Sequence, residues 1–280
     1  MIKTLLVIDV NKKIGSGHLN RCLNLVNSLK GLSEFEFVGE KKYFPKIKNK
    51  IYNTSLDEIS IDIFDKELKF DLVIVDSYRF RKKILNFVKK ISKKKLLIDD
   101  FISDYKNFNY ILNNNPGISN LDYKNFKKDN LFTGNKFTLI DSKFKTIEKK
   151  VFNRLNIFLN CGLYDQKNIL IPIIRKIKKV QNIIKFDCYI GLSKNSKNYI
   201  KVKKLTKKYK FLKLISNDKN YMRTIPKCNI AICPLGISVW ERILSGMIVF
   251  TFTTDKRQKL VFKRILKKKY VYNFNFKNKN

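Results

Sequence analysis

Leu5-Leu6-Val7-Ile8 and, after it, the loop Gly15-Ser16-Gly17-His18 set the pattern for the first half of the chain. A short, continuous apolar run of this kind is typical of a strand that is buried on both faces of a parallel sheet. Beyond the loop, apolar residues recur at helical spacing from Leu19 to Leu29, and Gly31 follows as a helix stop. The sequence therefore predicts a strand, a glycine-containing loop and a helix in succession.

The same alternation of strand and helix recurs along the chain. The predicted strands are Leu72–Val75, Leu96–Ile98, Tyr110–Leu112, Leu155–Leu159, Phe186–Ile190, Phe211–Ile215, Ile230–Cys233 and Met247–Phe252. The predicted helices cover about 81–90, 167–179 and 238–244. A polar stretch at 141–153 divides the chain, so we expect two α/β domains with parallel sheets, residues 1–150 and 151–280.

The composition is that of a folded protein with an unusual charge. Of 280 residues, 44% are hydrophobic and 13% aromatic, which excludes wholesale disorder. The net charge is +37, but lysine supplies 51 of the 60 basic residues and is spread along the whole chain. Arginine, the residue preferred for two-point phosphate recognition, is scarce. We therefore expect no specific nucleic-acid partner; a nucleic-acid-binding protein would instead have clustered lysines and a steep salt dependence.

Several protein classes are excluded by what the sequence lacks. No apolar stretch approaches the roughly 18 residues of a membrane span, and the apolar N-terminus is too short for a signal peptide. The five cysteines are scattered and odd in number, so neither a disulfide framework nor a zinc ribbon is expected. With a single histidine, no metal cluster is expected either. We predict a cytoplasmic protein without metal or cofactor.

His18 is the first candidate for chemistry. It stands after the first predicted strand, at the start of a helix, and ligands of open parallel sheets bind at the carboxyl ends of strands. An imidazole there is a candidate general base, although a histidine at a helix start also serves as a backbone hydrogen-bond partner. The preceding loop Gly15–Gly17 offers backbone N–H groups to an anion, or is simply a tight turn.

Acidic residues follow two of the predicted strands. Asp76 and Tyr78 come after one, and Asp99 with Asp100 after the next. Because the carboxyl ends of parallel strands share one edge of a sheet, these residues are candidates for substrate contacts or for orienting a base. The alternative is that they only cap their own loops.

A second glycine loop, Pro234–Ser238, precedes the helix that carries Glu241. A carboxylate near a helix start can accept hydrogen bonds from a ribose diol while the helix N-terminus holds phosphate. The competing interpretation is a capping box, with Ser238 as the N-cap and Glu241 three residues later.

Taken together, these motifs resemble the UDP-sugar hydrolases of pseudaminic acid biosynthesis, which release UDP from UDP-2,4-diacetamido-2,4,6-trideoxy-β-L-altrose. The motifs follow one another in order over about residues 1 to 260. They are Ile14-Gly15-Ser16-Gly17-His18-Leu19-Asn20-Arg21-Cys22-Leu23, Val75-Asp76-Ser77-Tyr78, Leu97-Ile98-Asp99-Asp100, Leu112-Asn113-Asn114-Asn115, Phe158-Leu159-Asn160-Cys161-Gly162 and Ser238-Val239-Trp240-Glu241. The first motif is the most specific.

The resemblance implies a GT-B-like fold, with two Rossmann-like parallel-sheet domains facing a cleft and the nucleotide held mainly by the second. It implies that His18 is the general base that activates water, that Asp76 and Tyr78 lie beside the sugar, and that Glu241 binds ribose. A UDP-sugar is then the partner, and no metal is needed. The substrate contacts that it implies are Gly15, Gly17, Arg21, Asp99, Asn160, Gly162, Asp165, Gly236, Ser238, Glu241 and Gln258.

Three stretches of the second domain depart from the family pattern. They are Cys161-Gly162-Leu163-Tyr164-Asp165, Leu235-Gly236-Ile237-Ser238 and Arg257-Gln258, where the family has a Gly-Gly pair with a hydroxyl residue, a Gly-Gly-Ser-Thr type of loop and an Asn-Gln pair. Two alternatives therefore stay open: a glycosyltransferase that uses a UDP-sugar donor, and a homologue that binds UDP without turnover. The sequence indicates neither the exact sugar nor the oligomeric state.

Overall fold

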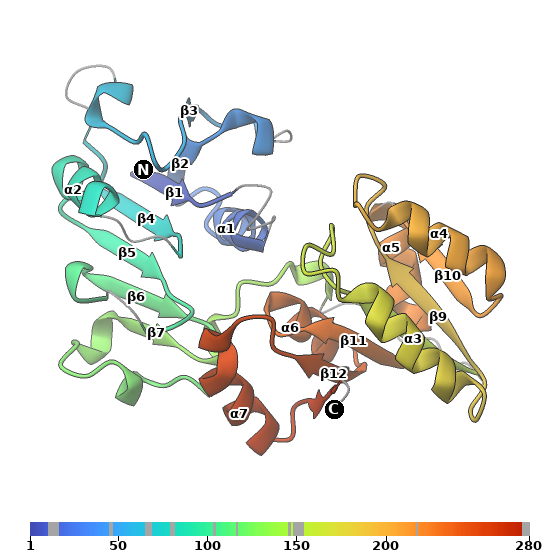
Figure 1. Ribbon diagram of the computed structural model, residues 1–280. Coiled ribbons are helices and arrows are strands. Elements are labelled where there is room, and N and C mark those ends of the chain that lie inside the picture. Colours follow the sequence, from blue (N-terminus) through green and yellow to red (C-terminus); the bar gives the residue numbers. More distant parts are fainter. Residues whose placement is uncertain are drawn as a thin grey trace. The chain divides into compact units, whose positions relative to one another are not determined.

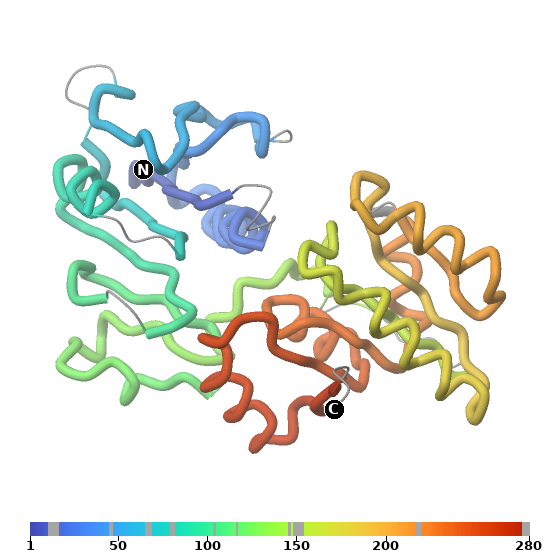
Figure 2. The backbone as a smooth tube through the Cα atoms, viewed as in Figure 1, coloured from blue at the N-terminus to red at the C-terminus, as the bar shows by residue number. Residues whose placement is uncertain are grey.

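The computed structural model describes residues 1–10, 17–44, 47–64, 69–78, 82–102, 105–115, 117–144, 147, 154–216 and 218–275, without the side chains of 218 and 219. The chain forms two compact units, Met1–Leu139 and Ile140–Asn280. The domain boundary expected at residue 150 lies outside the described residues. Figure 1 labels the elements of each unit, and Figure 2 follows the chain from blue through green in the first unit to red in the second.

The first unit is built on a parallel sheet that has seven strands within the described residues, in the order β3-β2-β1-β4-β5-β6-β7. Its strands are β1 (Ile2–Ile8), β2 (Ser33–Gly39), β3 (Ile51–Asn53), β4 (Leu72–Asp76), β5 (Lys95–Ile98), β6 (Tyr110–Asn113) and β7 (Leu131–Thr133). The register pairs Ile8 of β1 with Asp76 of β4, so these two strands end side by side.

The second unit repeats this architecture with a six-stranded sheet, counted over the described residues, in the order β10-β9-β8-β11-β12-β13. Its strands are β8 (Leu155–Asn160), β9 (Phe186–Gly191), β10 (Leu212–Ile215), β11 (Ile230–Pro234), β12 (Ile248–Phe252) and β13 (Tyr272–Asn273). All pairings between neighbouring strands are parallel. The predicted parallel α/β organisation is therefore confirmed.

Helices connect the strands and cover the sheets (Figure 1). The α-helices are α1 (Gly17–Ser28), α2 (Lys82–Ile91), α3 (Leu170–Gln181), α4 (Tyr199–Lys208), α5 (Asp218–Thr224), α6 (Ile237–Leu244) and α7 (Lys259–Lys267). Short 3₁₀ helices are η1 (Lys41–Tyr43), η2 (Ile61–Ile63), η3 (Tyr105–Asn107), η4 (Asn120–Asp122), η5 (Lys128–Asn130), η6 (Asn135–Phe137), η7 (Ser142–Phe144), η8 (Ile225–Lys227) and η9 (Lys256–Gln258). Among the described helices, none has both the length and the apolar character to cross a membrane.

The two cores explain why the apolar runs became strands. In the first unit, Leu6 and Ile8 pack with Cys22 of α1 and Phe37 of β2, and all four are almost fully buried. In the second, Leu159 packs against Ile173 and Ile177 on one face of α3. Burial on both faces requires continuous apolar strands, which is the pattern of β1 and β8.

Several elements were not predicted, and their sequences explain why. Strand β2 reads Ser-Glu-Phe-Glu-Phe-Val-Gly, so its apolar residues alternate with acidic ones at the start. Strands β3 and β7 have three residues each, too few for a periodic signal. Helix α4 carries lysines on most of its surface and buries only Val202. Tertiary packing decided these elements, not local pattern.

Each sheet has a point where the strand order reverses. In the first unit the chain runs outward from β1 through β2 to β3, then returns to β4 on the other side of β1. In the second, it runs from β8 through β9 to β10 and returns to β11. The loops after the two central strands diverge at such a point, which leaves a crevice at their carboxyl ends. The candidate site residues of each unit follow strands at or next to its reversal point.

Candidate active site

His18 and Asp76 meet at the reversal point of the first sheet. Asp76 is the last residue of β4, and His18 is the second residue of the helix that follows β1. Both side chains are buried, with 4% and 0% of their surface exposed. The Nδ1 atom of His18 is hydrogen-bonded to Oδ1 of Asp76. Two residues that are 58 positions apart in the chain thus form one buried pair.

Asp76 is the acceptor at the centre of a larger cluster. Helical spacing places Arg21 and Cys22 on the same face of α1 as His18, one turn further on. Arg21 donates from Nε to Oδ2 of Asp76 at 2.6 Å and from Nη2 to Oδ1 at 2.5 Å. The thiol of Cys22 lies 3.4 Å from Oδ2. Burial alone raises the pKa of Asp76, but Arg21 and His18 outweigh it and hold this pKa well below its usual range.

The ionised state of Asp76 decides which nitrogen of His18 carries the proton. A carboxylate accepts hydrogen bonds and donates none, so the proton of a neutral imidazole lies on Nδ1. The lone pair is then on Nε2. That atom is buried and has no hydrogen-bond partner among the residues that the structure describes. An imidazole held by a carboxylate through one nitrogen, with the other nitrogen left to accept a proton, is the arrangement of a general base.

Asp100 forms the second branch of the cluster, beyond the end of β5. The Nη1 atom of Arg21 donates to both of its carboxylate oxygens, at 2.8 and 2.9 Å. The hydroxyl of Tyr78 donates to Oδ2 at 2.8 Å. Burial raises the pKa of Asp100, yet Arg21 outweighs it and the pKa lies below its ordinary value. The sequence named Asp100 as a candidate, but its link to Arg21 across 79 positions came from the structure.

Tyr78 connects this branch to His18. Its ring meets the imidazole edge to face, with the ring centres 4.3 Å apart, and the ring centre of Phe101 lies 4.9 Å from that of Tyr78. Partial burial and the Asp100 carboxylate raise the pKa of Tyr78, so the hydroxyl stays protonated and donates. With 39% of its surface exposed, Tyr78 can also meet a bound molecule.

Asp99 has a different place from Asp100. It is 3% exposed, and its Oδ1 accepts the backbone N–H groups of Phe101 and Ile102 at 2.9 and 3.2 Å. Its Oδ2 accepts the hydroxyl of Tyr123 at 2.8 Å. Ile102 has φ of 59°, a strained value for a β-branched residue. Asp99 therefore holds the conformation of the loop that carries Asp100. Of the two interpretations of Asp99 from the sequence, these contacts favour loop capping over substrate contact.

The glycine loop before His18 falls partly outside the description. Gly15 is among the residues that the structure does not describe. Gly17 is the exposed first residue of α1, and a Cβ atom there would meet nothing within 4 Å.

In the second unit, the residues predicted after β8 are used to shape their own loop. Asn160, the last residue of β8, accepts the N–H of Gly162 at 3.0 Å and donates to the carbonyl of Gly191 at 3.0 Å. Gly162 has φ of 82°, a conformation that favours glycine. Asp165 is buried and accepts the N–H of Ile169 at 2.9 Å, so it caps the start of α3.

The loop after β11 corrects one interpretation. Helix α6 begins at Ile237 with Gly236 as its N-cap, so Ser238 is inside the helix and Glu241 is in its second turn. The capping box of Ser238 and Glu241 is therefore wrong. Instead, Glu241 forms an ion pair with Nη2 of Arg242 at 3.7 Å and lies near Lys143 and Asp141. Burial is the main cause that raises the pKa of Glu241 to about 7.

Gln258 supports the glycine loop from the neighbouring strand connection. Its Nε2 donates to the carbonyl of Leu235 at 2.9 Å, and its Oε1 accepts the N–H of Thr254 at 2.9 Å. The adjacent Arg257 donates to Asp255 through Nε and Nη2, at 3.1 and 2.8 Å. Gln258 thus ties the loop after β12 to the loop that starts α6.

Arg242 is a feature that the sequence did not indicate. Its side chain is completely buried, and Nε, Nη1 and Nη2 have no hydrogen-bond partner within the described part of the chain. The guanidinium lies over the rings of Phe158 and Tyr221, 4.9 Å from each centre, and 5.9 Å from that of Phe144. Burial lowers the pKa of Arg242 to about 9.

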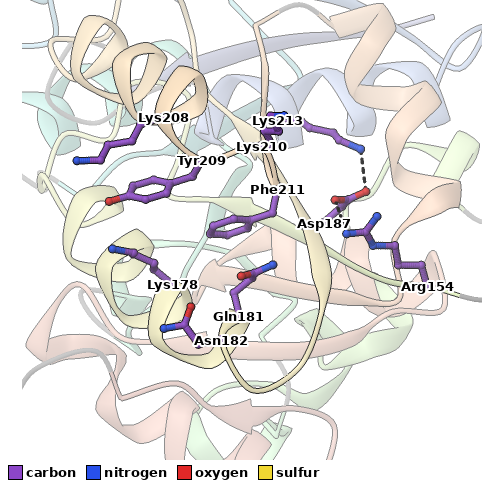
Figure 3. A pocket seen from close by; sticks show the side chains of 10 residues that line it. All are labelled: Arg154, Lys178, Gln181, Asn182, Asp187, Lys208, Tyr209, Lys210, Phe211 and Lys213. Atoms are coloured by element: carbon purple, nitrogen blue, oxygen red, sulfur yellow. Dashed lines mark hydrogen bonds and ion pairs between the residues drawn. The ribbon is translucent and has the colours of Figure 1, made fainter.

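A polar pocket of about 580 Å³ lies elsewhere in the second unit (Figure 3). It is lined by Arg154, Lys178, Gln181, Asn182, Asp187, Lys208, Tyr209, Lys210, Phe211 and Lys213. These residues stand at the amino ends of the strands and the carboxyl ends of α3 and α4. Cations are favoured at helix C-termini and anions are not, so the basic lining has a structural explanation. Its Asp187 is paired with Lys213 at 2.8 Å and Arg154 at 3.4 Å.

Metal ligands are not gathered in the described residues. No group of three or more His, Cys, Asp or Glu side chains there has the geometry to hold a metal ion.

Comparison of sequences finds a relative of low sequence identity. No model of a known protein family matches the chain. Over 285 residues, covering 95% of the chain, it is 21% identical to the uncharacterized protein MJ1062 of Methanocaldococcus jannaschii. The chain spans 59% of the length of that relative.

Comparison of structures shows the fold. MurG of Acinetobacter baumannii is similar with a TM-score of 0.68, at 11% identity over 99% of this chain and 87% of that one. UDP-GlcNAc 2-epimerase of Neisseria meningitidis, bound to UDP-GlcNAc, gives 0.58 at 15% identity over 94% and 85%. The E. coli heptosyltransferase WaaC with ADP gives 0.50 at 10% identity over 89% and 86%. The chain accordingly has a GT-B fold of two parallel-sheet α/β units, as the sequence predicted.

Proposed function

We propose that this protein hydrolyses a UDP-linked diacetamido-trideoxy sugar at its anomeric carbon, with His18 as the general base. The observation that carries the proposal is the state of His18: Nδ1 is held by Asp76, and Nε2 is buried without a partner in the described residues. The GT-B neighbours add support, because those solved with ligands include an epimerase with UDP-GlcNAc and MnaA of S. aureus with UDP. The diacetamido-trideoxy sugar is proposed as the substrate because the motifs that resemble the hydrolase family follow one another in order along the chain.

In the proposed reaction, a water molecule donates a proton to Nε2 of His18 while its oxygen attacks the anomeric carbon. The bond between that carbon and the diphosphate oxygen breaks, and UDP leaves with the electron pair. The products are the free sugar and UDP, and the imidazolium returns its proton to solvent. Asp76 stabilises the imidazolium and fixes the ring, while Tyr78 offers its exposed edge to the sugar.

The second unit would hold the nucleotide at its own reversal point. Helix α6 starts at Ile237, after its N-cap Gly236, and backbone N–H groups at a helix start suit a diphosphate. A Cβ atom at Gly236 would meet nothing within 4 Å. Glu241 would accept the ribose hydroxyls. Asn160, Asp165 and Gln258 would act by shaping the loops, because their polar atoms are engaged within the unit. No metal is required if these amides stabilise the leaving UDP.

The test is UDP release from UDP-2,4-diacetamido-2,4,6-trideoxy-β-L-altrose without acceptor or added metal. We expect wild type to release UDP and His18→Asn to lose about 10² or more of the rate. Calorimetry of UDP binding is the control, since His18→Asn leaves the second unit unchanged. Undiminished release by the variant would remove His18 from its role.

A glycosyltransferase is the second candidate, because the heptosyltransferase WaaC shares the fold. Its reaction differs only in that an acceptor hydroxyl replaces water. UDP binding by wild type without release would favour this candidate over hydrolysis. Turnover of the same donor in water alone would exclude it.

A further inference from the structure

The charges around His18 do not balance. Arg21 contacts both oxygens of Asp76 through Nε and Nη2, and both oxygens of Asp100 through Nη1. One positive charge thus lies between two negative ones. With His18 neutral, this group has a net charge of −1; with His18 protonated, it is neutral. Counted over these four described side chains, the cluster with a neutral His18 therefore has one negative charge in excess.

We propose that Asp100 is a positioning residue that supplies the unbalanced negative charge for the protonated form of His18. This inference rests on the proposed function, in which His18 takes a proton from water. Asp76 alone does not suffice, because the guanidinium of Arg21 already neutralises it. Asp100 draws one branch of that guanidinium away and restores the charge that an imidazolium needs.

Asp100 also acts on the orientation of the imidazole. It accepts the hydroxyl of Tyr78, and the Tyr78 ring packs edge to face against His18. Asn115 donates from Nδ2 to Oδ1 of Asp100 at 3.1 Å and fixes the carboxylate from the far side. Asp100 is therefore connected to His18 by one ionic and one aromatic path.

Three other described groups lie in or next to the cluster: the thiol of Cys22 and the carboxylates of Asp9 and Asp99. Burial raises the pKa of Cys22, so its thiol carries no charge at neutral pH. Asp9, at the end of the β1 side, accepts the hydroxyl of Ser77 at 3.1 Å. Asp99 accepts Tyr123 and two backbone amides. Among the described residues, Asp100 is the carboxylate that shares Arg21 with Asp76.

The experiment uses the fact that His18 is the only histidine in the chain. The imidazole protons of the full chain, without an affinity tag, are followed by NMR as the pH changes. Asp100→Asn keeps the size of the side chain and removes its charge. Because the imidazolium loses a neighbouring anion, this change should lower the titration midpoint of the imidazole by about one pH unit.

Two further variants separate charge from structure. Asp129→Asn removes the same charge from an exposed residue of η5 in the same unit, and it should leave the midpoint unchanged. Asp100→Glu restores the charge and should recover the wild-type midpoint in large part. A midpoint in Asp100→Asn equal to that in Asp129→Asn would overturn the proposal, whatever happens to stability.

The kinetic readout is the pH dependence of kcat/KM for UDP release. In Asp100→Asn the acidic limb should move to lower pH, and the plateau should fall about tenfold because a weaker base accepts the proton less readily. If wild type releases no UDP, the proposed function fails. The NMR midpoint still decides the role of Asp100 in that case, so the two failures can be told apart.

Discussion

The substitution Asp76→Asn tests the centre of the site. Asparagine has the shape of aspartate but presents an NH₂ group in place of one oxygen. At the Oδ2 position this group would face Nε of Arg21, a donor whose proton is fixed. At the Oδ1 position it would displace the hydrogen bond from Nη2 of Arg21, and it would face Nδ1 of His18, which can pass its proton to Nε2. Nη2 of Arg21, 3.5 Å from Nδ1, can then donate to that nitrogen. We expect this second arrangement.

Two magnitudes follow from the geometry. A proton on Nε2 leaves no lone pair for water, and a catalytic histidine in the wrong tautomer costs about 10⁴ in rate. Removing one partner of a buried ion pair destabilises a protein by about 3–5 kcal/mol. Because Arg21 keeps Asp100 as a partner, we expect about 3 kcal/mol, or a fall of about 10 °C in the thermal midpoint.

The assay has three readouts: kcat for UDP release, the thermal midpoint, and the imidazole ¹⁵N shifts of the sole histidine. The ¹⁵N shifts report the tautomer without substrate, so they hold even if the substrate is misassigned. The control is Asp129→Asn, which removes a carboxylate far from the cluster. A variant that keeps the wild-type ¹⁵N pattern and rate would refute the assignment of the tautomer to Asp76.

Two further predictions concern the second unit. The pKa of Glu241, raised to about 7 by burial, predicts that UDP binds more tightly as the pH rises from 6 to 8, because the ionised form accepts ribose hydroxyls better. Calorimetry with Glu241→Gln measures the part of the pH dependence of UDP affinity that comes from protonation of UDP itself. If the affinity of wild type and of this variant depends on pH in the same way, a role for Glu241 is contradicted. Arg242→Met should lower the thermal midpoint, because it removes a buried guanidinium that pairs with Glu241 at 3.7 Å and lies over the rings of Phe158 and Tyr221. Removing one partner of a buried ion pair destabilises a protein by up to about 3–5 kcal/mol. An unchanged or higher midpoint on differential scanning calorimetry would contradict a stabilising role for this ion pair and these ring contacts.

The sequence predicted individual residues of the candidate site but not their convergence, and this difference has a physical cause. His18, Arg21 and Cys22 are one helical turn apart, so the motif around His18 already contained their common face. Asp76 and Asp100 follow apolar runs, which placed them at strand ends. Their convergence on Arg21 depends on β4 and β5 lying next to one another on one side of β1. No local spacing carries that information.

In the second unit, two features of the structure differ from what the local sequence suggested. Spacing alone suggested that Ser238 and Glu241 form a capping box, but the helix begins two residues earlier than that pairing requires. Likewise, nothing in the run Trp240-Glu241-Arg242 indicates that the arginine is buried among Phe144, Phe158 and Tyr221. An arginine in an amphipathic helix is ordinarily exposed, so only packing reveals the exception.

By itself, the amino-acid sequence determined the alternation of strands and helices, the parallel α/β class and the candidates at the strand ends. It could do so because buried strands and amphipathic helices leave local periods in the chain. The tertiary structure alone decided the order of strands, the buried pair of His18 and Asp76, and the sharing of Arg21 with Asp100. Those features join residues 55 to 79 positions apart, and long-range convergence of side chains is set by how the elements pack, not by their local pattern.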